Sequence, residues 1–115
     1  MHMEQPSIYH NPRCSKSRAC LNRLIEKGYQ PNIIEYTKHP LDFEKLEALS
    51  QHFELSEFVR TNEKIYKELN LSLNDKKQVL LAILDEPKLL QRPIVTFQKQ
   101  AIIARPPEKV DVLFE

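Results

Sequence analysis

The sequence is short of cysteine and of any excess of charge, and each shortage excludes a class of protein. Its two cysteines, Cys14 and Cys20, are too few for a disulfide scaffold. Lys and Arg number 17 against 16 Asp and Glu, so the net charge of +1 gives no field that would draw the chain to nucleic acid or to an anionic membrane. No apolar run is long enough to cross a membrane. We therefore expect neither nucleic acid nor membrane as a partner.

The length and the cysteine usage predict one domain in a reducing compartment. A chain of 115 residues can bury a core without disulfides or metals. No charged-then-apolar leader precedes Ser7, so we expect a cytoplasmic protein. The opening Met1-His2-Met3 suggests Met3 as the natural start and is left out of the fold prediction. The predicted domain covers residues 7–115, with a helical insertion at about 41–90.

Glycine is almost absent, and the single one, Gly28, marks the end of a predicted helix. Ser7–His10 is typical of a strand, and helical spacing of apolar residues begins after Ser15. A second strand is predicted at Asn32–Thr37, which makes the first part a β-α-β unit with a parallel strand pair. The predicted inward positions of the helix are Cys20, Leu21, Leu24 and Ile25.

The middle of the chain is predicted to be almost wholly helical. The first of its helices would carry Phe43, Leu46, Leu49 and Phe53 inward. Ser56 can cap a short turn that runs to Arg60, and a short helix at Asn62–Leu69 would place Ile65 and Leu69 inward. A last helix would begin at Asn74 or Asp75, with Val79, Leu80, Ile83 and Leu84 inward, and would end before Pro87.

The chain then returns to strands. Ile94–Phe97 and Ala101–Ala104 flank residues 98–100, which predicts a hairpin whose turn lacks glycine. Pro106 and Pro107 can begin a final helix, with Val110, Leu113 and Phe114 inward. The order βαβ, helical insertion, ββα predicts an α/β fold with a small four-stranded mixed sheet.

Cys14 is the candidate nucleophile. It lies in the stretch Tyr9-His10-Asn11-Pro12-Arg13-Cys14-Ser15-Lys16-Ser17-Arg18, where a predicted strand turns into a helix. The unpaired N–H groups and the dipole of a helix N-terminus favour an anion there. Arg13, Lys16 and Arg18 would act in the same direction, because nearby cations lower a cysteine pKa. We expect a reactive thiolate.

Three arginines stand at candidate positions for anion binding. Arg92 and Arg105 each precede a proline at the margin of a predicted strand, and Arg60 ends a short helical turn. Each of them alone is more often an exposed surface residue. Together they have the chemistry to hold a tetrahedral oxyanion, since guanidinium groups donate in pairs and stay charged.

Four motifs give the chain a resemblance to a known family. They are the Tyr9–Arg18 stretch, Val59-Arg60-Thr61-Asn62-Glu63, Gln91-Arg92-Pro93-Ile94-Val95 and Ala104-Arg105-Pro106-Pro107-Glu108. In this order and spacing they resemble the glutaredoxin-dependent arsenate reductase family, from about Ser7 to the end of the chain. The resemblance implies a thioredoxin-like fold with a helical insertion, in which Pro93 follows a cis peptide bond and faces the cysteine.

The resemblance also implies roles for residues. Cys14 would be the nucleophile, and Arg60, Arg92 and Arg105 would bind the oxyanion. The implied reaction is attack of Cys14 on arsenate, addition of glutathione to the arsenic and release of arsenite with electrons from glutaredoxin. Glutathione would be a co-substrate, with no tightly bound cofactor, nucleotide or metal.

Several residues keep a second interpretation. Cys20 fits the apolar positions of its helix and is predicted to lie in the core. The cysteines and histidines lack the paired spacing of zinc ligands. His10 could act as a general acid or base, could steer the charge of the cysteine, or could be a packed histidine with satisfied ring nitrogens.

Two other functions remain open from the sequence. The first is a general glutathione-linked thiol/disulfide oxidoreductase with the same fold and cysteine. The second is a thiol-sensing regulator that binds RNA polymerase, although such regulators carry a second cysteine where this chain has Ser17. Arg13 stands where the best-studied members of the family tend to have a small residue, which leaves the substrate open.

Overall fold

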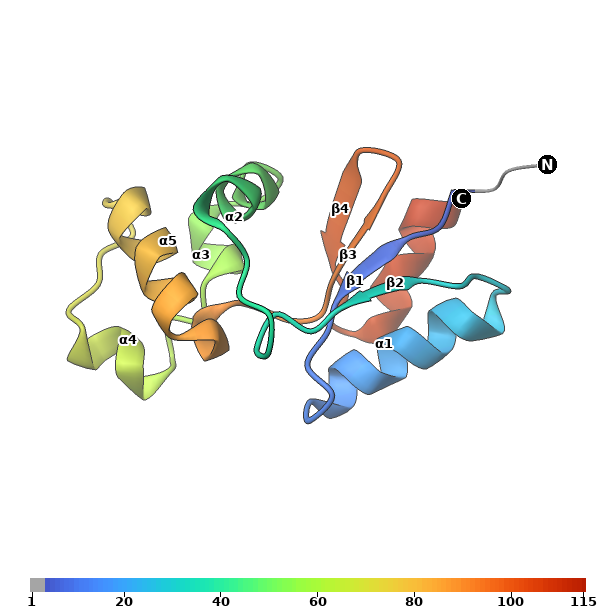
Figure 1. Cartoon of the computed structure of the whole chain (residues 1–115), viewed down its shortest axis with the longest axis horizontal. Coiled ribbons are helices and arrows are strands. Elements are labelled where there is room, and N and C mark those ends of the chain that lie inside the picture. The colour runs from blue at the N-terminus through green and yellow to red at the C-terminus, as the bar shows by residue number, and fades with distance from the viewer. Residues whose placement is uncertain (1–3) are drawn as a thin grey trace. The chain divides into compact units, whose positions relative to one another are not determined.

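The computed structural model describes residues 4–115, and the Met1-His2-Met3 opening lies outside them. The chain forms two compact units. The first combines the residues up to Tyr36 with Arg92–Glu115, and the second is Thr37–Gln91. Figure 1 labels the elements of both.

A four-stranded mixed sheet organises the first unit. Its strands are β1 (Ser7–Tyr9), β2 (Asn32–Ile34), β3 (Ile94–Phe97) and β4 (Gln100–Ile103), in the order β2-β1-β3-β4. β1 and β2 are parallel, whereas β1 with β3 and β3 with β4 are antiparallel. The predicted α/β class and mixed sheet are confirmed. The first two strands are shorter than predicted, since they end at Tyr9 and Ile34.

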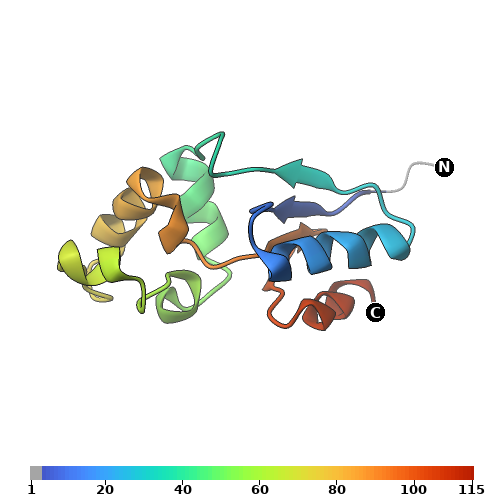
Figure 2. The ribbon, with the colours of Figure 1, turned by 90° about the horizontal axis from the view of Figure 1, so that it is seen from below.

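Two helices lie side by side against one face of this sheet. They are α1 (Ser15–Glu26) and the 3₁₀ helix η2 (Pro107–Phe114), and they contact each other directly (Figure 2). The buried core of the unit comprises Ile8, Cys20, Leu24, Val95, Ala104, Val110 and Leu113. The predicted inward position of Ile25 is wrong, because its side chain is 53% exposed at the end of α1.

Gly28 ends α1 as predicted. Its φ of 95° lies in the left-handed region that glycine adopts without steric cost. The Gly28 N–H donates to the Ile25 carbonyl (2.9 Å), and the Tyr29 N–H donates to the Leu24 carbonyl (3.2 Å), which is a Schellman motif. The Tyr29 ring then stacks on Phe114 at 4.5 Å between centroids.

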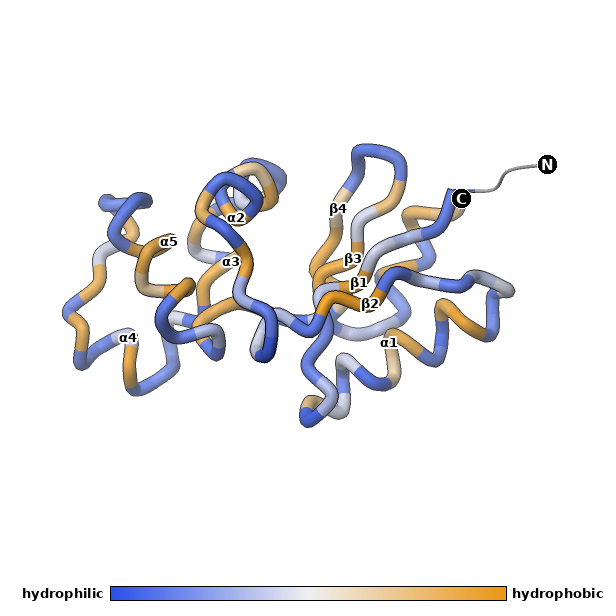
Figure 3. Tube along the Cα trace, viewed as in Figure 1, coloured by the Kyte–Doolittle hydropathy of each residue, from blue (hydrophilic) through white to orange (hydrophobic). Residues whose placement is uncertain are grey.

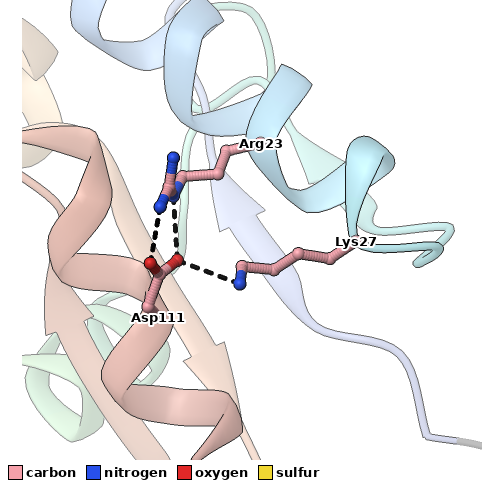
Figure 4. Close-up of polar contacts among 3 residues, drawn as sticks. All are labelled: Arg23, Lys27 and Asp111. Atoms are coloured by element: carbon pink, nitrogen blue, oxygen red, sulfur yellow. Dashed lines mark hydrogen bonds and ion pairs between the residues drawn. The ribbon is translucent and has the colours of Figure 1, made fainter.

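A bidentate ion pair joins α1 to η2 (Figure 4). Arg23 Nε and Nη2 donate to the two carboxylate oxygens of Asp111, at 2.8 and 2.5 Å. Lys27 Nζ lies 3.1 Å from Asp111 Oδ1. The hydrogen bonds from Arg23, followed by that from Lys27, hold the pKa of the Asp111 carboxyl well below its usual range. Asp111 is therefore a carboxylate shared by two cations of one helix.

The hairpin between β3 and β4 forms without glycine. Gln98 and Lys99 both have positive φ, 50° and 69°, which is the backbone that a tight two-residue hairpin turn requires. Gln100 already belongs to β4. The turn therefore has two residues instead of the predicted three. Both residues have a left-handed backbone, a conformation that glycine and asparagine adopt more readily.

The second unit is helical. It contains α2 (Phe43–Ser50), α3 (Leu55–Phe58), α4 (Lys64–Glu68), α5 (Lys76–Asp85) and the 3₁₀ helix η1 (Pro87–Leu89). Asp42 caps α2 by accepting from the Lys45 N–H (2.8 Å), and Asp75 caps α5 by accepting from the Gln78 N–H (3.1 Å). α2 packs against α5. The middle of α5 is apolar, and so are the strands β2 and β3 of the first unit (Figure 3). Of the two predicted starts of α5, Asn74 and Asp75, the structure has Asp75 at the N-cap.

Three predictions about this unit are wrong in detail. α2 ends at Ser50, so Phe53 lies beyond it and stacks on Phe58 at 5.9 Å. α3 has Glu54 rather than Ser56 at its N-cap. α4 buries no residue, and Leu69 is 43% exposed, because a five-residue helix presents too little surface to form an inward face.

Among residues 4–115, no helix has the length and apolar character to span a bilayer.

Candidate active site

Cys14 lies in the turn between β1 and α1, at the N-cap position of the helix. The turn is held by its own backbone. The Cys14 N–H donates to the Asn11 carbonyl (3.0 Å), and the Cys14 carbonyl accepts from the Arg18 N–H (3.0 Å). The Arg13 N–H donates to Asn11 Oδ1, also at 3.0 Å. The thiol is half-buried at the first turn of α1, where N–H groups point outward.

The surroundings of Cys14 lower its pKa. Burial acts to raise the pKa, but hydrogen bonds from the Ser17 N–H, the Arg92 side chain and the Lys16 N–H act the other way, as does the charge of Arg92. The net result is a pKa below the usual value for a thiol. Because the thiolate is the reactive form, this environment favours a nucleophilic cysteine.

The predicted direction of this shift is confirmed, and so is one of its predicted sources, the N–H groups in the first turn of α1. Arg13, Lys16 and Arg18 are exposed. Arg18 Nη1 donates instead to the Pro12 carbonyl at 2.8 Å, and so braces the turn. Solvent screens the charge of an exposed cation, whereas Arg92 bonds to the sulfur itself. The cation that matters comes from a residue 78 positions further along the chain.

Arg92 and Arg105 are linked to each other. The Arg105 Nη1 atom donates to the Arg92 main-chain carbonyl at 2.9 Å. Both arginines precede cis prolines, Pro93 and Pro106. The predicted cis bond at Pro93 is confirmed, and the one at Pro106 was not predicted. The first unit therefore connects three of the predicted site residues in series: Cys14 to Arg92, and Arg92 to Arg105.

Arg60, the fourth predicted site residue, belongs to the second unit. Its N–H donates to the Leu89 carbonyl (2.7 Å), next to a β-bridge between Val59 and Leu90. Its Nη1 atom lies 3.5 Å from Glu63 Oε1, and the side chain is only 18% exposed. Both the backbone and the side chain of Arg60 are therefore held by contacts within the second unit. The part of Arg60 in the site with Cys14 stays a prediction.

Ser17 is a site residue that the sequence did not reveal. Its side chain is completely buried, and its Oγ atom lies 2.6 Å from His10 Nδ1. The same oxygen accepts a hydrogen bond from the Asn11 N–H at 3.1 Å. Ser17 shares the buried face of α1 with Cys20 and Leu24, at positions i, i+3 and i+7. A buried hydroxyl needs a hydrogen-bond partner, so a serine on the apolar face of the helix was the signal that the sequence offered for this contact.

His10 is packed beside this turn, with 5% of its surface exposed. Burial lowers its pKa, an effect that Glu35 opposes and Arg18 reinforces. Its Nδ1 atom is satisfied by Ser17, as a packed histidine requires. A role in acid–base chemistry would fall to the other ring nitrogen, Nε2.

Cys20 is a core residue, as predicted. It is fully buried, and burial raises the pKa of its thiol to about 12. An unpaired thiol of this kind is inert. In the part of the chain that the structure describes, no three or more His, Cys, Asp or Glu side chains group together as metal ligands.

Known proteins of similar sequence and structure identify the family of this chain. A model of the ArsC family matches residues 9–113. The chain is 44% identical to the uncharacterized protein YfgD of Escherichia coli, with 93% of this chain and 94% of that protein covered. It is 37% identical to an arsenate reductase of Neisseria meningitidis, with coverage of 96% and 99%.

A solved structure, an arsenate reductase from Vibrio cholerae, superposes with a TM-score of 0.89 at 38% identity and covers 97% of this chain and 99% of that one. The βαβ and ββα segments around the mixed sheet thus form a thioredoxin-like fold, with helices inserted between β2 and β3. The family model, these relatives and the shared fold show that the chain belongs to the ArsC family.

Proposed function

We propose that this protein is an arsenate reductase that uses Cys14 as its nucleophile, glutathione as co-substrate and glutaredoxin as electron donor, in the reducing cytoplasm. The observation that carries the proposal is the pairing of a low-pKa cysteine with the Arg92 guanidinium at the start of α1. Relatives with 37–44% identity include a named arsenate reductase, which supports arsenate as the oxyanion.

The proposed chemistry follows from the charges. The Cys14 thiolate attacks arsenic(V), and a sulfur–arsenic bond replaces an arsenic–oxygen bond as water leaves. Glutathione then adds to the same arsenic with loss of a second water. A glutaredoxin thiolate attacks the glutathione sulfur, so two thiols become one mixed disulfide and two electrons reduce arsenic(V) to arsenic(III). Hydrolysis of the remaining sulfur–arsenic bond releases arsenite and restores Cys14.

The arginines have a defined task in this scheme. Arg92 is already beside the sulfur, so its charge would stabilise both the thiolate and an anion bound next to it without reorganisation. Arg105 and Arg60 would supply further guanidinium donors to the oxyanion. The mechanism needs one protein thiol, which agrees with a serine at position 17 and an inert Cys20.

A coupled assay tests the proposal. NADPH oxidation is followed with arsenate, glutathione, glutaredoxin and glutathione reductase present. Wild type should turn over arsenate, Cys14→Ser should not, and Arg92→Ala should lose about 100-fold or more in rate. Arg60→Ala should lose activity if Arg60 binds the anion. Cys20→Ala is the matched control, because it removes the other cysteine and should retain activity.

The same assay separates the alternatives. If arsenate is not turned over, and wild type and Cys14→Ser are equally silent, the proposal fails. If the protein instead reduces a glutathione mixed disulfide without arsenate, in a Cys14-dependent manner, it is a general thiol/disulfide oxidoreductase. Stoichiometric binding to RNA polymerase would favour the thiol-sensing regulator.

A further inference from the structure

We propose that Arg105 is a positioning residue, whose guanidinium holds the Arg92 main chain so that the Arg92 side chain stays on the Cys14 sulfur before any oxyanion binds. This deepens the proposed function, and rests on it only in taking Cys14 as the nucleophile. The family resemblance implied a direct contact between Arg105 and the anion. The geometry adds a second task for the same side chain.

The side chain of Arg105 ties β3 to β4 where the backbone pairing of these strands ends. Arg92 lies two residues before β3, and Arg105 lies two residues after β4. The Ala104 N–H donates to the Pro93 carbonyl at 2.9 Å, which extends the β3–β4 ladder by one bond. Arg105 Nη1 then donates to the next carbonyl, that of Arg92, also at 2.9 Å. The side chain of Arg105 therefore continues the ladder after its backbone has stopped pairing with β3.

A guanidinium-to-carbonyl hydrogen bond has a charged donor, and such bonds are shorter and stronger than neutral ones. This one is partly buried, where solvent competes less for the carbonyl. Arg105 holds Arg92 by its backbone, and so leaves the Arg92 guanidinium for the sulfur. Arg105 has five N–H donors, so one bond to Arg92 leaves others for an anion.

Arg105 donates to the Arg92 backbone, and Arg92 in turn acts on Cys14 through a hydrogen bond and through its charge. In this arrangement, the effect of Arg105 on the free thiol passes through Arg92. This gives the proposal a signature that a simple anion ligand lacks.

The experiment measures the apparent pKa of Cys14 in the full chain from the pH dependence of its alkylation by iodoacetamide, in buffer without arsenate, phosphate or sulfate. Arg92→Ala should raise this pKa, and Arg105→Ala should raise it by at least half as much. In the double variant, the Arg105 substitution should add little to the Arg92 shift, because residues that act in series are not additive. Arg13→Ala, which removes an exposed charge next to Cys14, is the matched control and should leave the pKa near wild type.

Two results would overturn the proposal. One is a wild-type Cys14 pKa in Arg105→Ala, even if arsenate turnover is lost, since Arg105 would then serve the anion alone. The other is an Arg105 shift that adds in full to the Arg92 shift. If Arg105→Ala does not fold, Arg105→Met keeps the bulk of the side chain and removes its donors, so it should raise the pKa in the same direction, and no shift would again refute the idea. A wild-type protein without arsenate turnover would refute the proposed function and leave this pKa test intact.

Discussion

The Oγ atom of Ser17 lies 2.6 Å from the Nδ1 atom of His10, and the two buried side chains join the end of β1 to the first turns of α1. Ser17→Ala removes the partner of both the His10 ring and the Asn11 N–H. We expect the free energy of unfolding to fall by about 1–3 kcal/mol, measured by urea denaturation. Ser15→Ala, at an exposed serine of the same turn, should change it by less than about 0.5 kcal/mol. Equal effects of the two substitutions would count against a structural role for the contact.

The lowered pKa of His10 predicts a pH-dependent stability. Burial disfavours the imidazolium, so below about pH 6.5 the unfolded chain takes up a proton at His10 more readily than the folded one. Stability should therefore decrease as pH falls from about 6.5 through the lower folded-state pKa. His10→Asn should flatten this part of the profile, measured by urea denaturation between pH 5 and 7. His39→Gln, at an exposed histidine, should leave it unchanged, and a profile that is the same in wild type and His10→Asn would contradict the prediction.

The two cysteines should differ sharply in reactivity. Cys14 has a lowered pKa and is half-buried, whereas Cys20 is fully buried with its pKa raised to about 12. Mass spectrometry after brief alkylation at neutral pH should find Cys14 modified and Cys20 unmodified in the folded protein. In denaturant both should react. Modification of Cys20 at a comparable rate under native conditions would show that the first unit opens far more often than its packing indicates.

The ion pair of Asp111 should stabilise the first unit only at pH values at which the Asp111 carboxyl is ionised. Arg23 and then Lys27 hold its pKa well below the usual range, so the stabilisation is complete above about pH 4 and is lost as pH falls further. Asp111→Asn should unfold at a lower temperature than wild type at pH 7, and added salt should narrow the gap. Glu4→Gln, an exposed acidic residue of the same unit, is the control. A gap that keeps its full size from pH 7 down to pH 2 would point to a cause other than the charge.

The turn of the β3–β4 hairpin should be improved by glycine. Lys99 has a φ of 69°, a conformation that costs a residue with a side chain about 1 kcal/mol or more. We expect Lys99→Gly to raise the free energy of unfolding by about 0.5–1 kcal/mol, because the relief of strain exceeds the added entropy of the unfolded chain. Lys99→Ala keeps the strained backbone and should bring no gain. A similar gain from both would attribute the effect to loss of the lysine charge.

Local sequence signals predicted most of the fold. Gly28 marked the end of α1, Asp75 was one of two predicted starts of α5, and each of the four strands was predicted at its place in the chain. These features depend on neighbouring residues, so they can be read from short stretches. The turn at Gln98 and Lys99 could not, because its left-handed backbone is imposed by the pairing of β3 with β4 rather than by the residues in it.

The candidate site was harder to predict. The position of Cys14 before a helix can be seen in the sequence, and it predicted the direction in which the pKa of Cys14 is shifted. The part of that shift that comes from the Ser17 and Lys16 N–H groups is local, whereas the part that comes from Arg92 depends on a tertiary contact. The partner of Ser17 likewise becomes visible only when β1 and α1 are placed together.

The interruption of the first unit by residues 37–91 has a consequence for the order in which a newly made chain can fold. β1, an inner strand of the sheet, pairs on one side with β2, which follows it closely, and on the other with β3, which leaves the ribosome only after the helices of the second unit. The face of α1 that contacts η2 likewise stays uncovered until η2, in the last residues of the sequence, has been made. The helical unit is continuous and rich in local contacts, so it can form early, while the reactive cysteine becomes activated late in synthesis.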